Sequence, residues 1–137
     1  MKNNTLTLTA VMAGLALAAF AHGDVDTSKL PPPSDKKDVT FEKDIKPIFE
    51  ASCVKCHSGE KPKAKLSLDT LENTLKGTPD EKVVIPGDSA KSELVHSVAQ
   101  IGDEDHWMPP PNNKAKIAPL TKEEVGLIRA WIDQGAK

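Results

Sequence analysis

The chain has 137 residues, a length that suits one domain, and a formal net charge of −2 from 18 basic and 20 acidic residues. No basic stripe runs along the sequence, so the charge pattern does not indicate nucleic acid as a partner. Aromatic residues make up only 4% of the chain. Because a domain this small buries only about two thirds of its unfolded surface, we expect a large apolar cofactor to form part of the core.

Residues 1–21 have the pattern of an export signal. Lys2 precedes an apolar run from Leu6 to Phe20, and the small residues at its end suit cleavage after Ala21. The run is shorter than the about 20 apolar residues that span a membrane, and polar residues interrupt it. We therefore expect a cleaved signal peptide rather than an anchor, and an exported protein, periplasmic or otherwise outside the cytoplasm, that is soluble after cleavage.

Residues 22–38 are polar, charged and rich in proline, which is typical of a flexible leader. Order should begin near Thr40, so we expect one domain over residues 39–137. Its first helix has apolar residues at helical spacing from Phe41 to Phe49, with Thr40 as the N-cap and Pro47 bending it slightly. This helix runs directly into the two cysteines of the chain.

Two short helices are expected in the middle of the domain. Asp69 and Glu72 fit a capping box for a helix that ends at Gly77. Residues 89–102 form an amphipathic pattern with one apolar face. Short extended segments join these helices to the rest of the domain.

The last helix has the strongest signals. Thr121 and Glu124 make a capping box, and Gly135 lies where a glycine cap is expected. Gly126 lies inside the helix, where it costs about 1 kcal/mol relative to alanine. It either allows another helix to approach closely or is simply tolerated.

Cys53 and Cys56, the only cysteines, are followed directly by His57. A structural zinc site needs four ligands, and the chain has no second cysteine pair. A thioredoxin-type dithiol follows a strand, whereas here a helix precedes the pair. A disulfide between the two would close a very small loop and stabilise little.

The cysteine and histidine residues fit the attachment of one covalent haem c. Cys53 and Cys56 can form thioethers with the two vinyl groups, and His57 is then placed as the proximal ligand of the iron. Covalent attachment suits an exported protein because the cofactor cannot be lost. A backbone carbonyl should accept the other ring N–H of His57, and Pro62 is the nearest candidate.

Met108, the only methionine after the signal segment, is the candidate for the sixth ligand. A thioether stabilises ferrous iron and raises the reduction potential, and the three prolines that follow restrict the loop. The alternatives are His106, His96 or a merely buried methionine. Five residues are expected to line the haem or the helix interface: Leu66, Leu68, Trp107, Phe49 and Trp131.

Five segments of the chain resemble the monohaem cytochrome c domain of planctomycete and verrucomicrobial proteins. They are FEKDIKPIFEASCVKCH, KLSLDTLENTLKG, VVIPGDSAKSELVHSV, MPPP and LTKEEVGLIRAWIDQGAK. The resemblance implies an all-α cytochrome c fold, with N- and C-terminal helices packed around the haem and with His57 and Met108 as axial ligands. Many relatives join this domain to others, so their wider activities are not implied here.

Electron transfer is the function that these features predict, with an unidentified redox partner protein. The alternative is a haem enzyme or sensor with an open sixth position, such as a peroxidase or a gas binder. A di-haem peroxidase needs a second attachment motif, which the chain lacks. A third reading is a haem subunit of a larger redox enzyme.

Charged residues gather beside both candidate ligands. They form either two solvated loops or a surface that steers an acidic partner. The lysines near the haem motif are Lys55, Lys61, Lys63 and Lys65, and the acidic residues before Met108 are Asp103, Glu104 and Asp105.

Overall fold

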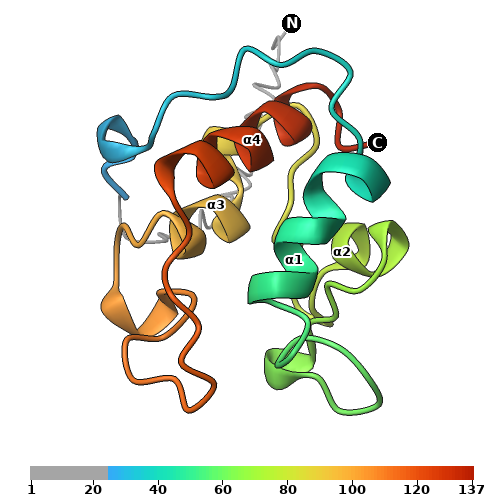
Figure 1. Cartoon of the computed structure of the whole chain (residues 1–137), viewed down its shortest axis with the longest axis vertical. Coiled ribbons are helices and arrows are strands. Elements are labelled where there is room, and N and C mark those ends of the chain that lie inside the picture. The colour runs from blue at the N-terminus through green and yellow to red at the C-terminus, as the bar shows by residue number, and fades with distance from the viewer. Residues whose placement is uncertain (1–24) are drawn as a thin grey trace, which may run out of the picture.

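The computed structural model describes residues 25–137, so the predicted signal peptide lies outside the described residues. Four α-helices form the framework (Figure 1): α1 (Lys46–Ser52), α2 (Leu71–Lys76), α3 (Glu93–Val98) and α4 (Lys122–Asp133). No strand occurs in residues 25–137, which confirms the predicted all-α class. None of the helices in this part of the chain combines the length and the apolar character needed to cross a membrane.

The first helical segment changes type between Ile45 and Lys46. It begins with a π-helical turn, η2 (Phe41–Ile45), in which the Lys46 N–H donates to the Phe41 carbonyl, and it continues as α1. Pro47 lies in the first turn of α1, where a missing N–H is tolerated. Thr40 is the N-cap residue as predicted, but its hydroxyl makes no capping bond. The Asp44 carboxylate instead accepts the Thr40 N–H at 2.9 Å.

The cap of α2 is one residue later than predicted. The Thr70 hydroxyl accepts the Asn73 N–H at 3.1 Å. Asp69 instead accepts bonds from the Ser67 hydroxyl and the Asn73 side chain. The helix ends at Gly77 as predicted, with φ of 76°, and a Cβ there would lie only 2.4 Å from a backbone oxygen.

The segment predicted as one helix over residues 89–102 is divided. A single 3₁₀ turn, η4 (Ser89–Lys91), precedes α3. Ser92 between them is extended, and its hydroxyl donates to the Asp88 carbonyl and accepts the Ile85 N–H, both at 2.9 Å. These local bonds compete with a continuous helix.

The capping box of α4 forms as predicted. The Thr121 N–H donates to the Glu124 carboxylate at 2.8 Å, and the Glu124 N–H donates to the Thr121 hydroxyl at 3.2 Å. The helix ends at Asp133, and Gly135 follows with φ of 100°. These bonds fix the ends of the longest helix in the described chain.

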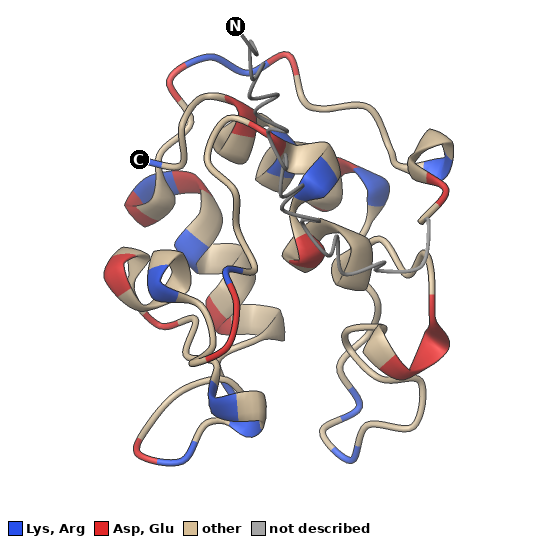
Figure 2. Ribbon diagram, turned by 180° about the vertical axis from the view of Figure 1, so that it is seen from behind, with Lys and Arg blue, Asp and Glu red and all other residues tan. Residues whose placement is uncertain are grey.

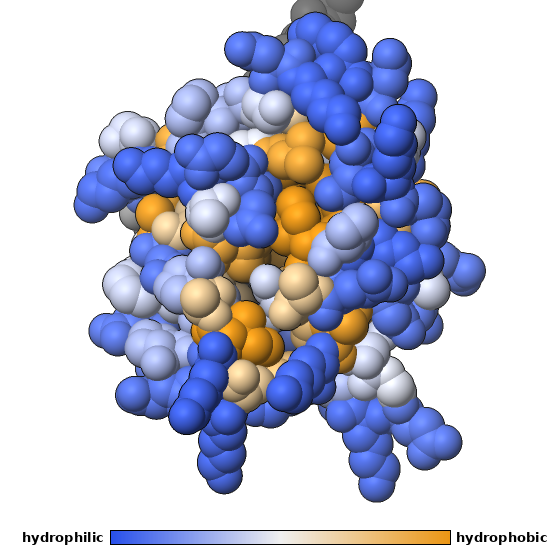
Figure 3. All heavy atoms as spheres, in the orientation of Figure 1, coloured by the Kyte–Doolittle hydropathy of each residue, from blue (hydrophilic) through white to orange (hydrophobic). Residues whose placement is uncertain are grey.

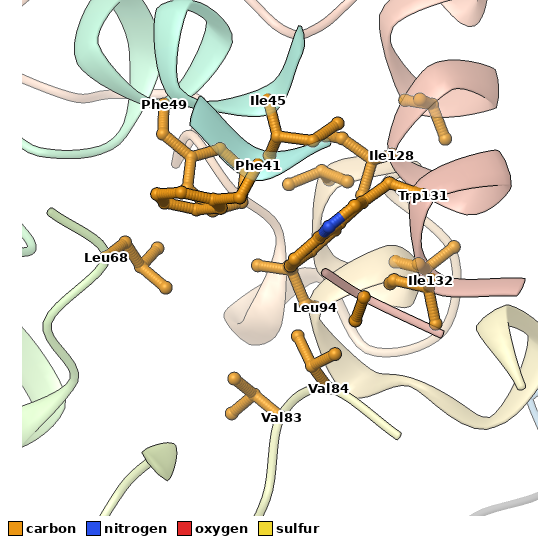
Figure 4. Close-up of a cluster of buried hydrophobic side chains, with 14 of the residues drawn as sticks. Phe41, Ile45, Phe49, Leu68, Val83, Val84, Leu94, Ile128, Trp131 and Ile132 are labelled. Carbon is orange, nitrogen blue, oxygen red and sulfur yellow. The ribbon is translucent and has the colours of Figure 1, made fainter. Parts of the chain in front are cut away.

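An aromatic cluster joins α4 to the first helical segment (Figure 4). The ring centroid of Phe41 lies 5.8 Å from that of Phe49 and 5.7 Å from that of Trp131. All three side chains are buried, and Trp131 donates its ring N–H to the Lys137 carbonyl at 3.0 Å. The Phe41–Phe49 pair is edge-on and the Phe41–Trp131 pair is tilted, and such aromatic pairs add to the stabilisation from buried area.

The segment 25–38, predicted to be a flexible leader, lies along α4 (Figure 1). Arg129 donates to the Pro31 carbonyl, and the Ser34 N–H donates to the Gly126 carbonyl at 2.8 Å. A Cβ on Gly126 would lie 2.7 Å from the Pro32 oxygen, so this glycine admits the leader rather than another helix. Packing therefore begins before the expected boundary at residue 39, because distant groups on α4 bond to the backbone of the proline-rich segment.

Candidate functional site

A cavity of about 1480 Å³ separates the loops that follow α1 from those around Met108. This volume exceeds the roughly 300–1,000 Å³ of ordinary small-molecule pockets. Figure 3 shows apolar atoms between these two parts of the molecule. The apolar wall is made by Leu66, Leu68, Val83, Leu94, Val98 and Ile101. Because Leu68, Val83 and Leu94 also belong to the core cluster, a large apolar group in the cavity would continue the core.

The end of α1 brings the two cysteines to the cavity. Cys53 is the C-cap residue, and its N–H donates to the Phe49 carbonyl at 2.7 Å. Its own carbonyl accepts the N–H groups of Cys56 and His57, at 3.1 and 3.0 Å. This tight turn places all three side chains of the motif in the cavity lining.

The His57 ring is oriented by a backbone carbonyl, but not by that of Pro62. Its Nδ1 lies 3.3 Å from the Leu66 oxygen, and the Leu68 N–H donates back to the His57 carbonyl at 2.8 Å. A bond from Nδ1–H to this carbonyl leaves Nε2 available as a ligand. Burial lowers the pKa of His57, and the bond to Leu66 partly opposes this shift. The neutral form that binds metals is therefore favoured.

The burial of Cys53 suits a thioether better than a redox thiol. The side chain is buried, and desolvation raises the pKa of Cys53 to about 12. Dithiol redox motifs depend instead on a depressed thiol pKa. A thioether has no proton to lose, so the same burial does not oppose it.

Met108 also lines the cavity. Its N–H donates to the Ser97 carbonyl of α3 at 2.9 Å, and its peptide bond to Pro109 is cis. The side-chain amide of Gln100 donates to the Pro109 carbonyl at 3.3 Å. The structure thus brings the predicted sixth ligand to the same cavity as Cys53 and His57.

The two rival histidines also line the cavity, in different situations. His96 is mostly buried, with Nε2 at 2.7 Å from the Ala90 carbonyl and Nδ1 at 3.3 Å from Glu93. Both of its ring nitrogens therefore have partners. His106 is largely exposed, and its Nδ1 lies 3.6 Å from Glu93.

Not all five predicted wall residues face the cavity. Leu66 and Leu68 line it, whereas Trp107, Phe49 and Trp131 do not. Phe49 and Trp131 belong to the aromatic cluster, which is the helix interface. The ring nitrogen of Trp107 is buried and has no hydrogen-bond partner within residues 25–137.

Residues 53–112 match the model of a family described as Planctomycete cytochrome C. This part of the chain is therefore similar to the planctomycete cytochrome c family. The matched segment begins at Cys53 and includes Met108, and similarity to this family implies a covalently bound haem c. The free thiols, the oriented His57 and the apolar cavity fit such a group. Neither the curated proteins nor the solved structures gave a match.

Two parts of the cavity lining were not predicted. Val25, Asp26 and Lys29 reach it from the leader, and residues 112–115 reach it from the loop after Met108. The leader carries no local sign of this role, because its contacts are with distant residues. The second loop carries Lys114 and Lys116, and their positive charge is the sequence feature that could have drawn attention to this loop.

Proposed function

We propose that this chain is an exported c-type cytochrome with one haem, and that it carries electrons. Cys53 and Cys56 would hold the cofactor covalently, and His57 and Met108 would bind its iron. The supporting observation is that one cavity, with an apolar wall, is lined by all four of these side chains.

The chain's residues hold and tune the site. When bound, haem iron alternates between the ferric and ferrous states. The Leu66 carbonyl orients His57, and the Ser97 carbonyl holds the backbone of Met108. The Met108 thioether favours the ferrous state, and the apolar wall reduces the access of water, so both raise the reduction potential.

The number of haems follows from the cysteines. The chain has only Cys53 and Cys56, which suffice for one attachment motif. With His57 and Met108 both bound to it, the iron would have no open position for a substrate. This arrangement favours an electron carrier over the peroxidase or gas-binding class.

Mass spectrometry and spectroscopy of the exported protein test the proposal. We expect one added haem mass, an N-terminus that begins after Ala21, and a weak far-red ferric band from a sulfur–iron bond. Met108→Ala should remove this band and lower the potential, because the remaining donors favour ferric iron more than sulfur does. The Met108→Ala, His106→Ala double variant should become high-spin and bind carbon monoxide.

Two results would change the proposal in different ways. A wild-type spectrum of two histidine ligands would exclude Met108 as a ligand but would leave electron transfer standing. Ready binding of carbon monoxide by the wild-type protein would instead favour an enzyme or a sensor.

A further inference from the structure

The C-terminal end of α3 closes in a Schellman motif whose left-handed residue is not glycine. The Ile101 N–H donates to the His96 carbonyl at 3.1 Å, and the Gln100 N–H donates to the Ser97 carbonyl at 3.2 Å. Gln100 has φ of 53°, which lies in the left-handed region. Glycine is the usual residue at this position, because a Cβ there raises the conformational energy of the backbone. Relative to glycine, Gln100 therefore destabilises the helix end, and any compensating gain must come from its side chain.

The side chain of Gln100 reaches the loop that carries Met108. Its amide donates to the carbonyl of Pro109, a buried residue, at 3.3 Å. In Figure 2 the acidic turn η5 (Glu104–His106), drawn partly in red, leads from α3 into this loop. Gln100 itself does not line the cavity. Its influence on the site therefore passes through the backbone of Met108 and Pro109.

The same helix end holds this backbone at a second point. The Ser97 carbonyl accepts the Met108 N–H at 2.9 Å as well as the Gln100 N–H. The loop is thus bonded to α3 before the Met108 side chain through its N–H, and after it through the Pro109 carbonyl. A segment held at one point can rotate about that point, whereas a segment held on both sides of a side chain fixes the direction of that side chain.

We propose that Gln100 is a positioning residue for the Met108 sulfur, and that its bond to the Pro109 carbonyl holds the thioether in place to bind haem iron. This inference rests on the proposed function, because it concerns how the sixth ligand is retained. A thioether favours ferrous iron, so ferric iron holds it less tightly and depends more on a preorganised loop. The left-handed backbone of Gln100 is then a local strain that the bond to the loop offsets.

Two substitutions separate the backbone of Gln100 from its side chain. Gln100→Gly removes the amide and relieves the left-handed strain, whereas Gln100→Leu removes the amide and keeps the strain. A residue that only ended the helix would give a glycine variant that equals or exceeds the wild type in every property. A residue that positions Met108 gives two variants that hold the sulfur less tightly, although the glycine variant unfolds at a higher temperature than the leucine variant.

The measurement is a titration of the ferric holoprotein with imidazole, followed by the weak far-red band of the sulfur–iron bond. An imidazole nitrogen replaces the Met108 sulfur, and the oxidation state of the iron does not change. Because one hydrogen bond changes an equilibrium by about twofold to tenfold, we expect both variants to bind imidazole tighter than the wild type by this factor. Asp38→Gly is the control, since Asp38 is exposed, has the same φ of 53° and does not line the cavity. It should titrate as the wild type does.

Hydrogen exchange of the holoprotein reports on the loop independently of the iron ligand. The peptide that contains Met108 should exchange about twofold to tenfold faster in both Gln100 variants than in the wild type, relative to peptides from α4. The Asp38→Gly control should show no such difference. If the leucine variant loses haem, Gln100→Asn replaces it, because asparagine tolerates the left-handed conformation and its side chain is too short for the bond.

The outcomes distinguish the role of Gln100 from the identity of the sixth ligand. Unchanged imidazole affinity and unchanged loop exchange in both variants would overturn the positioning role and leave the proposed electron transfer standing. Tighter imidazole binding by Gln100→Leu alone would also overturn it, because backbone strain rather than the amide would then be responsible. A wild-type spectrum without the sulfur–iron band would instead overturn Met108 as the ligand, and faster loop exchange in both variants would then show that Gln100 holds the loop without positioning a ligand.

Discussion

The α1–α4 interface and the cavity wall are both apolar, but they are completed differently. At the interface, Phe41, Phe49 and Trp131 contact one another and are almost fully buried. At the cavity wall, residues such as Leu66 and Leu68 have protein on one side and the cavity on the other. Side chains alone close the first region, whereas in the second the proposed haem would exclude water.

This difference explains how each region is fixed in position. Helical spacing and caps position the interface, and each side chain there is held by its neighbours. Backbone hydrogen bonds in loops position the cavity residues: His57 through Leu66, and Met108 through Ser97. Residues that border a large bound group can be positioned by backbone bonds, which do not depend on packing among side chains within the cavity.

Removing both cysteines that would form the thioether links should have the largest effect on stability, and it acts on the cavity wall. The Cys53→Ser, Cys56→Ser variant should lose covalent haem and most of its helical circular dichroism. The loss should exceed a typical domain's folding free energy of about 5–15 kcal/mol, because the cavity wall would face water.

Single substitutions of Cys53 or Cys56 by Ser should weaken or abolish covalent haem retention, as measured by mass spectrometry. A double variant that is exported and folded without haem would show that the cavity wall is stable without the cofactor. This result would contradict the cytochrome assignment.

Breaking the interface should have a smaller and separable effect. Trp131→Ala should lower the free energy of unfolding by about 3–5 kcal/mol, because it leaves a void beside Phe41 and Phe49. Since Trp131 does not line the cavity, the haem mass should remain. Denaturant titration measures the stability, and Trp131→Phe is the milder control. Loss of haem from a folded Trp131→Ala protein would mean that the two regions are not independent.

Gly126 provides a test of the leader, with an expected change of about 1 kcal/mol. In a protein that lacks residues 25–35, Gly126→Ala should raise the free energy of unfolding by about 1 kcal/mol through helix propensity. In the full chain the same substitution should lower it, because the new Cβ would lie 2.7 Å from the Pro32 oxygen.

Thermal unfolding of the four proteins in this cycle measures the coupling between Gly126 and the leader. An equal stabilising effect of Gly126→Ala in both backgrounds would mean that the leader does not contact α4 in solution.

The smallest predicted effect concerns Asp44 and depends on pH. A hydrogen bond from Lys36, and then one from the Thr40 N–H, hold the pKa of Asp44 below its ordinary value of 3.8. A depressed carboxyl pKa stabilises the fold above the unfolded-state value, and this contribution is lost as the pH falls through the folded-state value. Asp44→Asn should therefore be less stable than the wild type at neutral pH, and the difference should shrink below about pH 4.

Thermal unfolding between pH 2.5 and pH 7 measures this difference. Asp35→Asn, which changes an exposed carboxylate of the leader, is the control. A constant difference between wild type and Asp44→Asn across this range would contradict a stabilising role for the ionised Asp44 carboxylate.

The sequence predicted the features that depend on near neighbours. The Thr121–Glu124 capping box, the glycine ends of α2 and α4 and the apolar face of the first helix all depend on residues within a few positions of one another. The cap of α2 was predicted one residue too early because Asp69 and Thr70 are both good cap residues. The choice between them depends on Ser67 and Asn73, which occupy the Asp69 carboxylate.

The remaining features depend on contacts between distant segments. The Leu66 carbonyl could not be chosen from sequence, because every residue offers a backbone acceptor and only the fold selects one. The composition of the leader predicted flexibility. In the structure its backbone accepts a hydrogen bond from Arg129 and donates one to the Gly126 carbonyl, and composition does not predict such backbone contacts with α4. The sequence does not show that Lys114 lies near the same cavity as Lys55 and Lys63, because only the fold brings their two loops together.

The carbonyl of Lys137 accepts hydrogen bonds from the Phe41 N–H at 2.8 Å and from the Trp131 ring at 3.0 Å. Figure 1 places this end of the chain away from the loop tips. A peptide extension from Lys137 would keep its carbonyl oxygen as the acceptor, so a tether could be added without removing these bonds. A protein attached to an electrode through such a tether would keep the lysines of its loop tips facing the solution. Coupling through the lysine amines would instead turn these loops toward the electrode surface.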